Sequence, residues 1–247
     1  MTTPSSGPTN ARIMIVGEAP GEQEVLRREP FVGASGQELN RMLHEAGIMR
    51  SACFMTNVCR ERPPQNDISE WITPNKKCPD PAWQNVRGKW VHPHIVAGLA
   101  MLDQELALVQ PNVIIAFGNV AMWALTGKWG IKSWRGSLLQ TGGTIKCIPA
   151  YHPAYVLRDW AVRQITVHDL KRAKAQSETR ELPRSDYNFV IRPSFQQVSN
   201  ILSNWQAVVE HKPTVLSVDI ETRAGHLACL GIAGDTQAAL CIPFMCT

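Results

Sequence analysis

The segment Ile13-Met14-Ile15-Val16-Gly17-Glu18-Ala19-Pro20-Gly21 decides the fold class of this chain. Its apolar first half predicts a buried β-strand over residues 12–16, and an acidic loop bounded by glycines follows it. Apolar residues at helical spacing then predict a helix over residues 36–48. The order strand, loop, helix is typical of a βα unit that carries a ligand-binding loop at the strand end.

The same design occurs twice more along the chain. Asn57 follows the apolar run Cys53-Phe54-Met55, and His152 follows the apolar residues 145–148. In parallel sheets the carboxyl ends of the strands meet at one edge, and ligands bind there. We therefore expect Glu18, Asn57 and His152 to converge on one pocket, although they lie far apart in the sequence.

Further strands and helices alternate as far as residue 176. Strands are predicted at residues 113–116 and 144–150, and helices at residues 95–109, 119–125 and 161–176. This alternation predicts an α/β fold, a three-layer sandwich whose central sheet is mainly parallel. Residues 60–94 interrupt the pattern with many prolines and with Trp71, Trp83 and Trp90, which predicts a long irregular insertion.

Composition limits the classes of function. The chain has 247 residues, 44% of them hydrophobic, which is enough for a full core, and its net charge of +4 permits a polyanionic partner without requiring one. No apolar run approaches the roughly 18 residues of a membrane span, so we expect no membrane partner and a cytoplasmic location, or a host cytoplasm for a phage protein. The seven cysteines form no CxxC pair, which favours reduced thiols.

Shifts in composition predict four parts of the chain. Residues 1–11 are expected to be a disordered tail, residues 12–176 the first domain, residues 177–186 a polar linker, and residues 187–247 a second α/β unit. In that second unit, apolar runs at residues 227–233 and 238–244 predict two adjoining strands.

Eight motifs give the first domain a family resemblance. They are GEAPGEQE, PFVGASGQEL, TNV, RPP, AFGNVAMWALTGK, WRGS, YHPAYVLR and DLKRA, in this order between Ile13 and Ala173. Together they resemble the uracil-DNA glycosylase superfamily, most closely its family 4. The resemblance implies an enzyme that flips uracil out of single- or double-stranded DNA and cleaves its N-glycosidic bond.

The resemblance also implies roles for individual residues. Phe31 matches the aromatic that stacks on the flipped base, Asn57 the amide that reads uracil, and His152 the histidine that binds uracil O2 and stabilises the leaving base. Glu18 matches a glutamate on the pocket floor, which either orients water or stabilises a sugar cation. Glu24 matches the residue thought to exclude the methyl group of thymine.

The resemblance also concerns position 19 and the loops expected to contact DNA. Ala19 stands where other branches of the superfamily have a water-handling aspartate, so leaving-group stabilisation is expected to dominate. The loop from Tyr151 to Arg158, including Pro153, resembles the one that enters the duplex, with Leu157 as the wedge and Arg158 near a phosphate. Backbone amides of Gly17, Gly21, Gly33, Gly118 and Ser137 are candidates for a phosphate track, and tight turns explain these glycines equally well.

The sequence departs from the family pattern at the cysteine ligands of the cofactor. Family 4 members normally hold a four-iron cluster with four cysteines, but residues 1–12 contain none, Glu61 stands at the third position and Gly98 near the fourth. We therefore expect no iron–sulfur cluster and no other cofactor, with the tryptophan-rich insertion replacing the scaffold. A zinc site made by Cys59, Cys78, His92 and His94 is the less favoured alternative.

The second unit resembles a different protein family. Residues Val218-Asp219-Ile220-Glu221-Thr222 are similar to the first acidic motif of the ribonuclease H-like 3′–5′ exonuclease domain in polymerase I-type DNA polymerases. Asp219 and Glu221 would share one strand face as vestigial metal ligands, because the later acidic motifs are missing. This resemblance implies a partial exonuclease-like unit and a link to a DNA polymerase or to other replication proteins.

The leading hypothesis is thus a monofunctional uracil-DNA glycosylase attached to replication machinery. A binding module that keeps the pocket but has lost turnover is the chief alternative. A glycosylase for another modified pyrimidine is a third, because changes near Glu24 and Val25 could admit a substituent at C5 of the base.

Overall fold

The structure is a computed structural model that describes residues 2–74, 77–182, 188–209, 215–234 and 237–244. The chain forms two compact units, Met1–Leu182 and Pro183–Thr247, which we describe separately. Every helix in the described ranges is too short or too polar to traverse a membrane.

A five-stranded sheet forms the centre of the first unit. Its strand order is β2 (Cys53–Asn57), β1 (Ile13–Gly17), β6 (Val113–Phe117), β8 (Lys146–Ala150) and β7 (Leu139–Gln140). The first four strands are parallel, and β7 pairs antiparallel with β8 at the edge. The expected α/β class with a mainly parallel sheet is confirmed.

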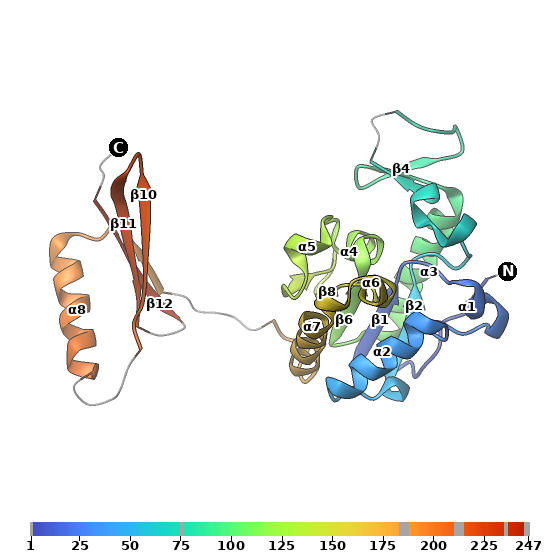
Figure 1. The fold of residues 1–247 in the computed structure, drawn as a ribbon, viewed down its shortest axis with the longest axis horizontal. Coiled ribbons are helices and arrows are strands. Elements are labelled where there is room, and N and C mark those ends of the chain that lie inside the picture. Colours follow the sequence, from blue (N-terminus) through green and yellow to red (C-terminus); the bar gives the residue numbers. More distant parts are fainter. Residues whose placement is uncertain (1, 75–76, 183–187, 210–214, 235–236, 245–247) are drawn as a thin grey trace. The chain divides into compact units, whose positions relative to one another are not determined.

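Alternation along the strands builds a core on each face of the sheet. Ile13 and Ile15 pack with residues of α2 (Ala34–Glu45) and α7 (Arg163–Gln176), while Met14 and Val16 pack with residues of α3 (Pro93–Val109) and α4 (Gly118–Thr126). Successive side chains of a strand point to opposite faces, so a fully apolar strand must be covered on both sides. Figure 1 shows the strands between these helices.

Short helices occupy several segments that the sequence predicts as loops. α1 (Glu22–Arg27) follows β1, and α6 (Pro153–Arg158) follows β8. Pro153 favours the start of α6, because its fixed φ suits a helix and it has no N–H that needs a partner. The other short elements are α5 (Ile131–Trp134) and the 3-10 helices Arg50–Ala52, Pro64–Asn66, Ile68–Trp71 and Trp160–Val162.

The insertion is more regular than the sequence indicates. It contains a small antiparallel sheet of β3 (Ile72–Thr73), β5 (Lys89–Val91) and β4 (Gln84–Val86). Arg87, at the hairpin turn, donates hydrogen bonds to the backbone oxygens of Trp123 and Ala124 at the end of α4. The hairpin is thereby attached to the main domain.

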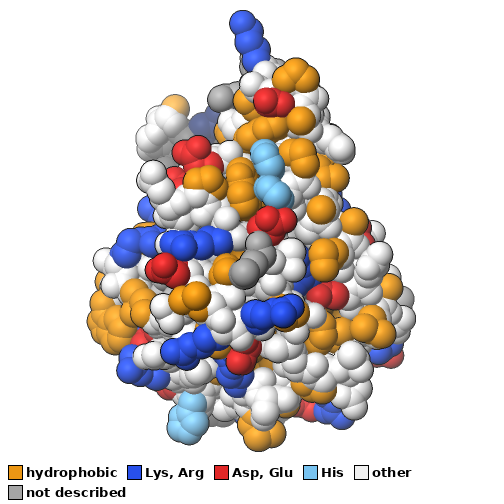
Figure 2. Space-filling model, turned by 90° about the vertical axis from the view of Figure 1, so that its right-hand side faces the viewer, with side chains coloured by type: hydrophobic (Ala, Val, Ile, Leu, Met, Phe, Trp, Pro, Cys, Tyr) orange, Lys and Arg blue, Asp and Glu red, His pale blue; other side chains and the backbone are white. Residues whose placement is uncertain are grey.

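Aromatic rings pack together where the insertion meets α3. The ring centroids of Trp71 and His92 are 5.5 Å apart and those of His92 and His94 are 4.6 Å apart. His94 Nδ1 lies 3.0 Å from Glu61 Oε1. Figure 2 shows histidine side chains on this surface between hydrophobic and acidic ones, with Lys and Arg side chains spread over the face.

Two segments expected to be loose are attached to the first unit. In the supposed tail, Thr3 N donates to Arg60 O at 2.9 Å and Ser6 bridges to Met55, so the expectation of disorder does not fit the described residues 2–11. After α7, Asn112 Nδ2 donates to Ser177 O at 2.6 Å. Lys146 Nζ donates to Thr179 O at 2.6 Å and to Glu181 O at 3.2 Å. The first residues of the supposed linker therefore pack on the sheet.

The second unit has a four-stranded sheet and one helix. The strand order is β10 (Ser217–Arg223), β11 (His226–Ala233), β12 (Ala238–Pro243) and β9 (Asn188–Ile191), and α8 (Phe195–Val209) follows β9 in the chain. β11 and β12 adjoin, as expected, and their pairing is antiparallel. Asp219 and Glu221 alternate with Val218 and Ile220 along β10, so the two carboxylates share one face of the strand.

Lys146 provides a test of the attached segment. Its side chain is fully buried, so Lys146→Met leaves the carbonyl oxygens of Thr179 and Glu181 without this donor while keeping most of the apolar stem. We expect the free energy of unfolding of the first unit to fall by about 1–3 kcal/mol in urea titrations. Lys171→Met on the exposed side of α7 is the control and should change it little. Equal stability of both variants would contradict the assigned role.

Candidate active site

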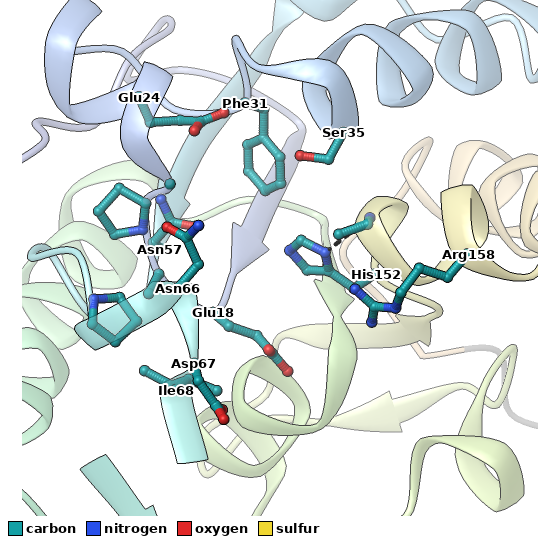
Figure 3. Close-up of a pocket in the computed structure, with 15 residues that line it drawn as sticks. Glu18, Glu24, Phe31, Ser35, Asn57, Asn66, Asp67, Ile68, His152 and Arg158 are labelled. Atoms are coloured by element: carbon teal, nitrogen blue, oxygen red, sulfur yellow. Dashed lines mark hydrogen bonds between the residues drawn. The ribbon is translucent and has the colours of Figure 1, made fainter. Parts of the chain in front are cut away.

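A cavity of about 490 Å³ opens where β1, β2 and β8 end. Its lining includes Glu18 from the loop after β1, Asn57 from the end of β2, His152 from the start of α6, and Phe31 from the loop before α2. Figure 3 shows these side chains around one space. The structure thus brings together the residues that strand topology predicts to converge.

Phe31 is held in an uncommon backbone conformation. Its φ is 57°, a left-handed value that bulky residues rarely adopt and that is found preferentially at functional sites. The carbonyl of Phe31 packs directly on Gly36 in α2, where any Cβ atom would collide with it. The ring contacts Phe117 edge-on, with centroids 6.2 Å apart, and presents itself to the cavity.

The carboxylate of Glu24 fixes the loop that carries Phe31. Glu24 Oε1 accepts hydrogen bonds from Val32 N at 3.0 Å and from Gly33 N at 2.8 Å. The side chain is buried and lines the cavity. Glu24 therefore has a clear structural role in addition to its place in the pocket wall.

The tautomer of His152 follows from its backbone contact. Its Nδ1 accepts a hydrogen bond from Ala154 N at 3.1 Å, so the ring proton must be on Nε2. Burial, assisted by the positive charge of Arg158, lowers the pKa of His152 from 6.5 to about 4. At neutral pH the residue is an uncharged imidazole whose Nε2–H is free to donate to a ligand.

Glu18 is anchored at the start of α4. Its Oε1 accepts a hydrogen bond from Val120 N at 3.1 Å, where the helix dipole favours negative charge. Burial raises the pKa of Glu18, while the N–H groups of Val120 and Asn119 and the charge of Arg158 oppose that rise. Gly118 has a φ of 88° and lies against the carboxylate, so a side chain there would displace it.

Asn57 has an amide that the protein leaves available. The residue is only 5% exposed, yet within the described part of the chain its side chain makes no hydrogen bond. The residue lines the cavity, so its amide is available to exchange hydrogen bonds with a bound ligand. Gly17 permits the geometry, because a Cβ atom there would collide with Asn57 Oδ1 and lie 2.6 Å from Phe31 Cζ.

The predicted site residues divide into two groups. Those that line the cavity are Glu18, Ala19, Gly21, Glu24, Phe31, Asn57, His152 and Arg158. Those outside its lining are Gly17, Gly33, Gly118, Ser137, Pro153 and Leu157. Gly17, Gly33 and Gly118 each lie within contact distance of a pocket side chain, so close packing accounts for these glycines.

Sequence reasoning missed part of the pocket wall. The additional lining residues are Pro20, Ser35, Pro63, Asn66, Asp67, Ile68 and Ala154. Ser35 belongs to the PFVGASGQEL motif and Pro63 to the RPP motif, so these two motifs could have identified both residues as part of the pocket. Asn66, Asp67 and Ile68 belong to the insertion, where no periodicity marks them. Asn66 has a φ of 61°, which the sequence alone does not reveal.

Comparison with known proteins agrees with this geometry. A sequence model of the uracil DNA glycosylase superfamily matches residues 4–175. The chain belongs to the uracil-DNA glycosylase superfamily. The type-4 uracil-DNA glycosylase of Thermotoga maritima is 34% identical over 173 residues, 68% of this chain and 79% of that protein. The type-4 enzyme of Pyrobaculum aerophilum is 34% identical over 168 residues, 65% of this chain and 75% of that protein.

A relative of another kind is also similar to the chain. The DNA polymerase of Bacillus phage SP01 is 26% identical over 166 residues, which make up 67% of this chain and 16% of that polymerase. The expected family is confirmed by these comparisons, and the exonuclease-like nature of the second unit is not.

The expectation that the chain has no iron–sulfur cluster is wrong. Its relatives are type-4 uracil-DNA glycosylases, which are iron–sulfur enzymes, and this contradicts the inference from missing cysteines. The described residues do not fit a cluster or the zinc alternative, since among them no three His, Cys, Asp or Glu side chains could hold a metal. We therefore assign no ligands and derive no step of the reaction through a cluster.

The ring of His152 gives a direct test of the site's electrostatics. Because its pKa is about 4, the imidazole should remain neutral with the proton on Nε2 where an ordinary histidine of pKa 6.5 titrates. In ¹⁵N-resolved NMR spectra we expect its ring signals to stay constant down to about pH 5. The ring signals of the exposed His44, recorded in the same spectra, serve as the control. Titration of His152 near its ordinary value would contradict this description.

Gly17 gives a second test. Gly17→Ala should move the Asn57 amide and the Phe31 ring, and we expect uracil excision under single-turnover conditions to slow at least about 100-fold, because small displacements in a catalytic site are that costly. Gly142→Ala is the matched control, because nothing lies within 4 Å of a Cβ atom there. A Gly17→Ala protein that excises at the wild-type rate would contradict the packing argument.

Proposed function

We propose that the protein hydrolyses the N-glycosidic bond of deoxyuridine in DNA, releasing uracil and leaving an abasic site. The decisive observation is one cavity that combines an aromatic face from Phe31, an unpaired amide from Asn57 and a neutral N–H donor from His152. Membership of the glycosylase superfamily and the similarity to type-4 uracil-DNA glycosylases support this enzyme class.

Recognition of uracil follows from hydrogen-bond polarity. The carbonyl of Asn57 can accept from N3–H of uracil and its NH₂ can donate to O4, whereas cytosine presents the opposite polarity at these positions. Phe31 supplies stacking on the flipped base, which contributes roughly 1–3 kcal/mol without reading base identity. Glu24 stands in the wall, in a position we assign to exclusion of the thymine methyl group.

The reaction depends on stabilising the departing base. As the bond between C1′ and N1 lengthens, negative charge builds on uracil O2, where the Nε2–H of His152 donates a hydrogen bond. Glu18 acts at the sugar, either orienting the attacking water or stabilising positive charge on the ring. Ala19 provides no second carboxylate for water activation.

Contacts with the DNA backbone complete the proposal. Leu157, 45% exposed beside the cavity on α6, is the candidate wedge that fills the space left by the flipped nucleotide. Backbone amides of Gly21, Gly33 and Ser137 remain candidates for phosphate contacts. Single- and double-stranded DNA containing uracil are the proposed substrates, and salt-sensitive binding follows from the phosphate contacts.

The second unit is proposed to be an exonuclease-like fragment. The similarity to the phage DNA polymerase and the carboxylate pair Asp219 and Glu221 on β10 support a polymerase link and a cytoplasmic location near replication proteins. In this proposal residues 12–176 are the glycosylase domain and residues 187–247 the exonuclease-like unit. With Mg²⁺ we expect no shortening of DNA from its 3′ end, and such shortening would contradict a vestigial site.

A labelled oligonucleotide with a single uracil tests the proposed function. Alkali should cleave it at the uracil after incubation with the wild-type protein, while Asn57→Ala and His152→Ala should each slow excision at least about 100-fold, because each removes a group that binds or stabilises the base. Asn85→Ala and His44→Ala are controls with the same substitutions on exposed positions. Binding without cleavage would favour a binding module that has lost turnover, and the absence of both binding and cleavage would contradict both hypotheses.

A further inference from the structure

The charges around the cavity are unbalanced toward acid. Glu18, Glu24 and Asp67 bring three carboxyl groups to its lining, and Arg158 is the one Lys or Arg among the described lining residues. Figure 3 shows the guanidinium of Arg158 turned toward His152 inside the site. Among the described residues no carboxylate forms an ion pair with Arg158, whose side chain is exposed at the cavity.

This arrangement matters because a uracil leaving group carries negative charge. When the bond between C1′ and N1 breaks, its electron pair remains on the base, and the charge is shared between N1 and the two carbonyl oxygens. His152 is uncharged and donates only a hydrogen bond, while nearby carboxylates repel an anion. Stabilising the uracil anion therefore calls for a positive charge on the same side of the pocket as His152.

We propose that Arg158 is a catalytic residue that stabilises the uracil anion beside His152, rather than serving only as a phosphate contact. This inference rests on the proposed function. The electrons of the broken bond stay on the base, water adds its oxygen to C1′, and the proton released from that water balances the charge of the product base. Arg158 contributes by electrostatic attraction and takes up no proton.

The position of Arg158 agrees with this role. Arg158 is the last residue of α6, and His152 directly precedes the first residue of that helix. Both residues line the cavity, so α6 carries the neutral donor at one end and the cation at the other. The guanidinium carbon of Arg158 lies 5.8 Å from the centroid of the Tyr155 ring, within the range of a cation–π interaction. The charge of Arg158 is close enough to act on both His152 and Glu18.

A comparison of two leaving groups separates this role from phosphate binding. Single-turnover excision is measured for Arg158→Gln on duplexes containing uracil or 5-fluorouracil, with the wild type as reference. Fluorine withdraws electrons and stabilises the anionic base, so a variant lacking the stabilising charge should lose less on 5-fluorouracil. We expect a loss of about 100-fold with uracil and a clearly smaller loss with 5-fluorouracil. Arg158→Lys keeps the charge and should recover much of the rate.

Binding measurements complete the test. Affinity for a duplex with a tetrahydrofuran abasic analogue should be nearly unchanged in Arg158→Gln, because no base anion is present. A phosphate contact would instead give equal losses of excision rate for the two bases and weaker binding of the abasic analogue. It would also reduce the slope of log affinity against log salt concentration by about 0.9. These results would overturn the proposal. An unchanged excision rate would also overturn it. Arg172→Gln on α7, outside the cavity lining, controls for net charge. A wild type that does not excise uracil would refute the proposed function instead.

Discussion

The parallel alignment of β1, β2 and β8 is the constraint on which the site depends. Parallel strands end at the same edge of the sheet, so residues that follow three separate strands are delivered to one place. Glu18, Asn57 and His152 each occupy such a position. Apolar cores on both faces of the sheet hold the strand ends in register, which makes the pocket a consequence of the fold rather than of flexible loops.

Backbone N–H groups prepare the polar side chains for a ligand. Ala154 N determines which nitrogen of His152 carries the proton, Val120 N holds Glu18, and Val32 N with Gly33 N hold Glu24. Each of these side chains is oriented before the substrate binds. The free-energy cost of ordering them is therefore offset during folding and does not add to the reaction barrier. Asn57 differs, because within the described residues no hydrogen bond orients its side-chain amide at the cavity wall.

Strand patterns and motifs predicted the main features of the fold and much of the pocket. Continuous apolar runs identify β1, β2, β6 and β8, since these strands are buried on both faces, and the βα order then determines which ends converge. The insertion was harder, because two- and three-residue strands leave no periodic signal. Before Asp67, Gln65 and Asn66 have positive φ values, which sequence patterns do not encode.

The cofactor shows a different limit of sequence reasoning. Missing cysteines at all four expected positions led to a prediction that the family comparison contradicts, so local motif loss is weaker evidence than overall similarity. Arg158 shows the reverse case. Its motif suggested a phosphate contact, whereas its place in the cavity lining, opposite three carboxyl groups, led us to propose that it stabilises the leaving base.

The most direct measurement is a crystal structure of the protein with a uracil-containing duplex after excision. The account predicts free uracil stacked on Phe31, with its N3 and O4 edge on the amide of Asn57 and its O2 within hydrogen-bond distance of His152 Nε2. Uracil bound outside this cavity, or paired with Asn57 while His152 turns away, would contradict the central claim.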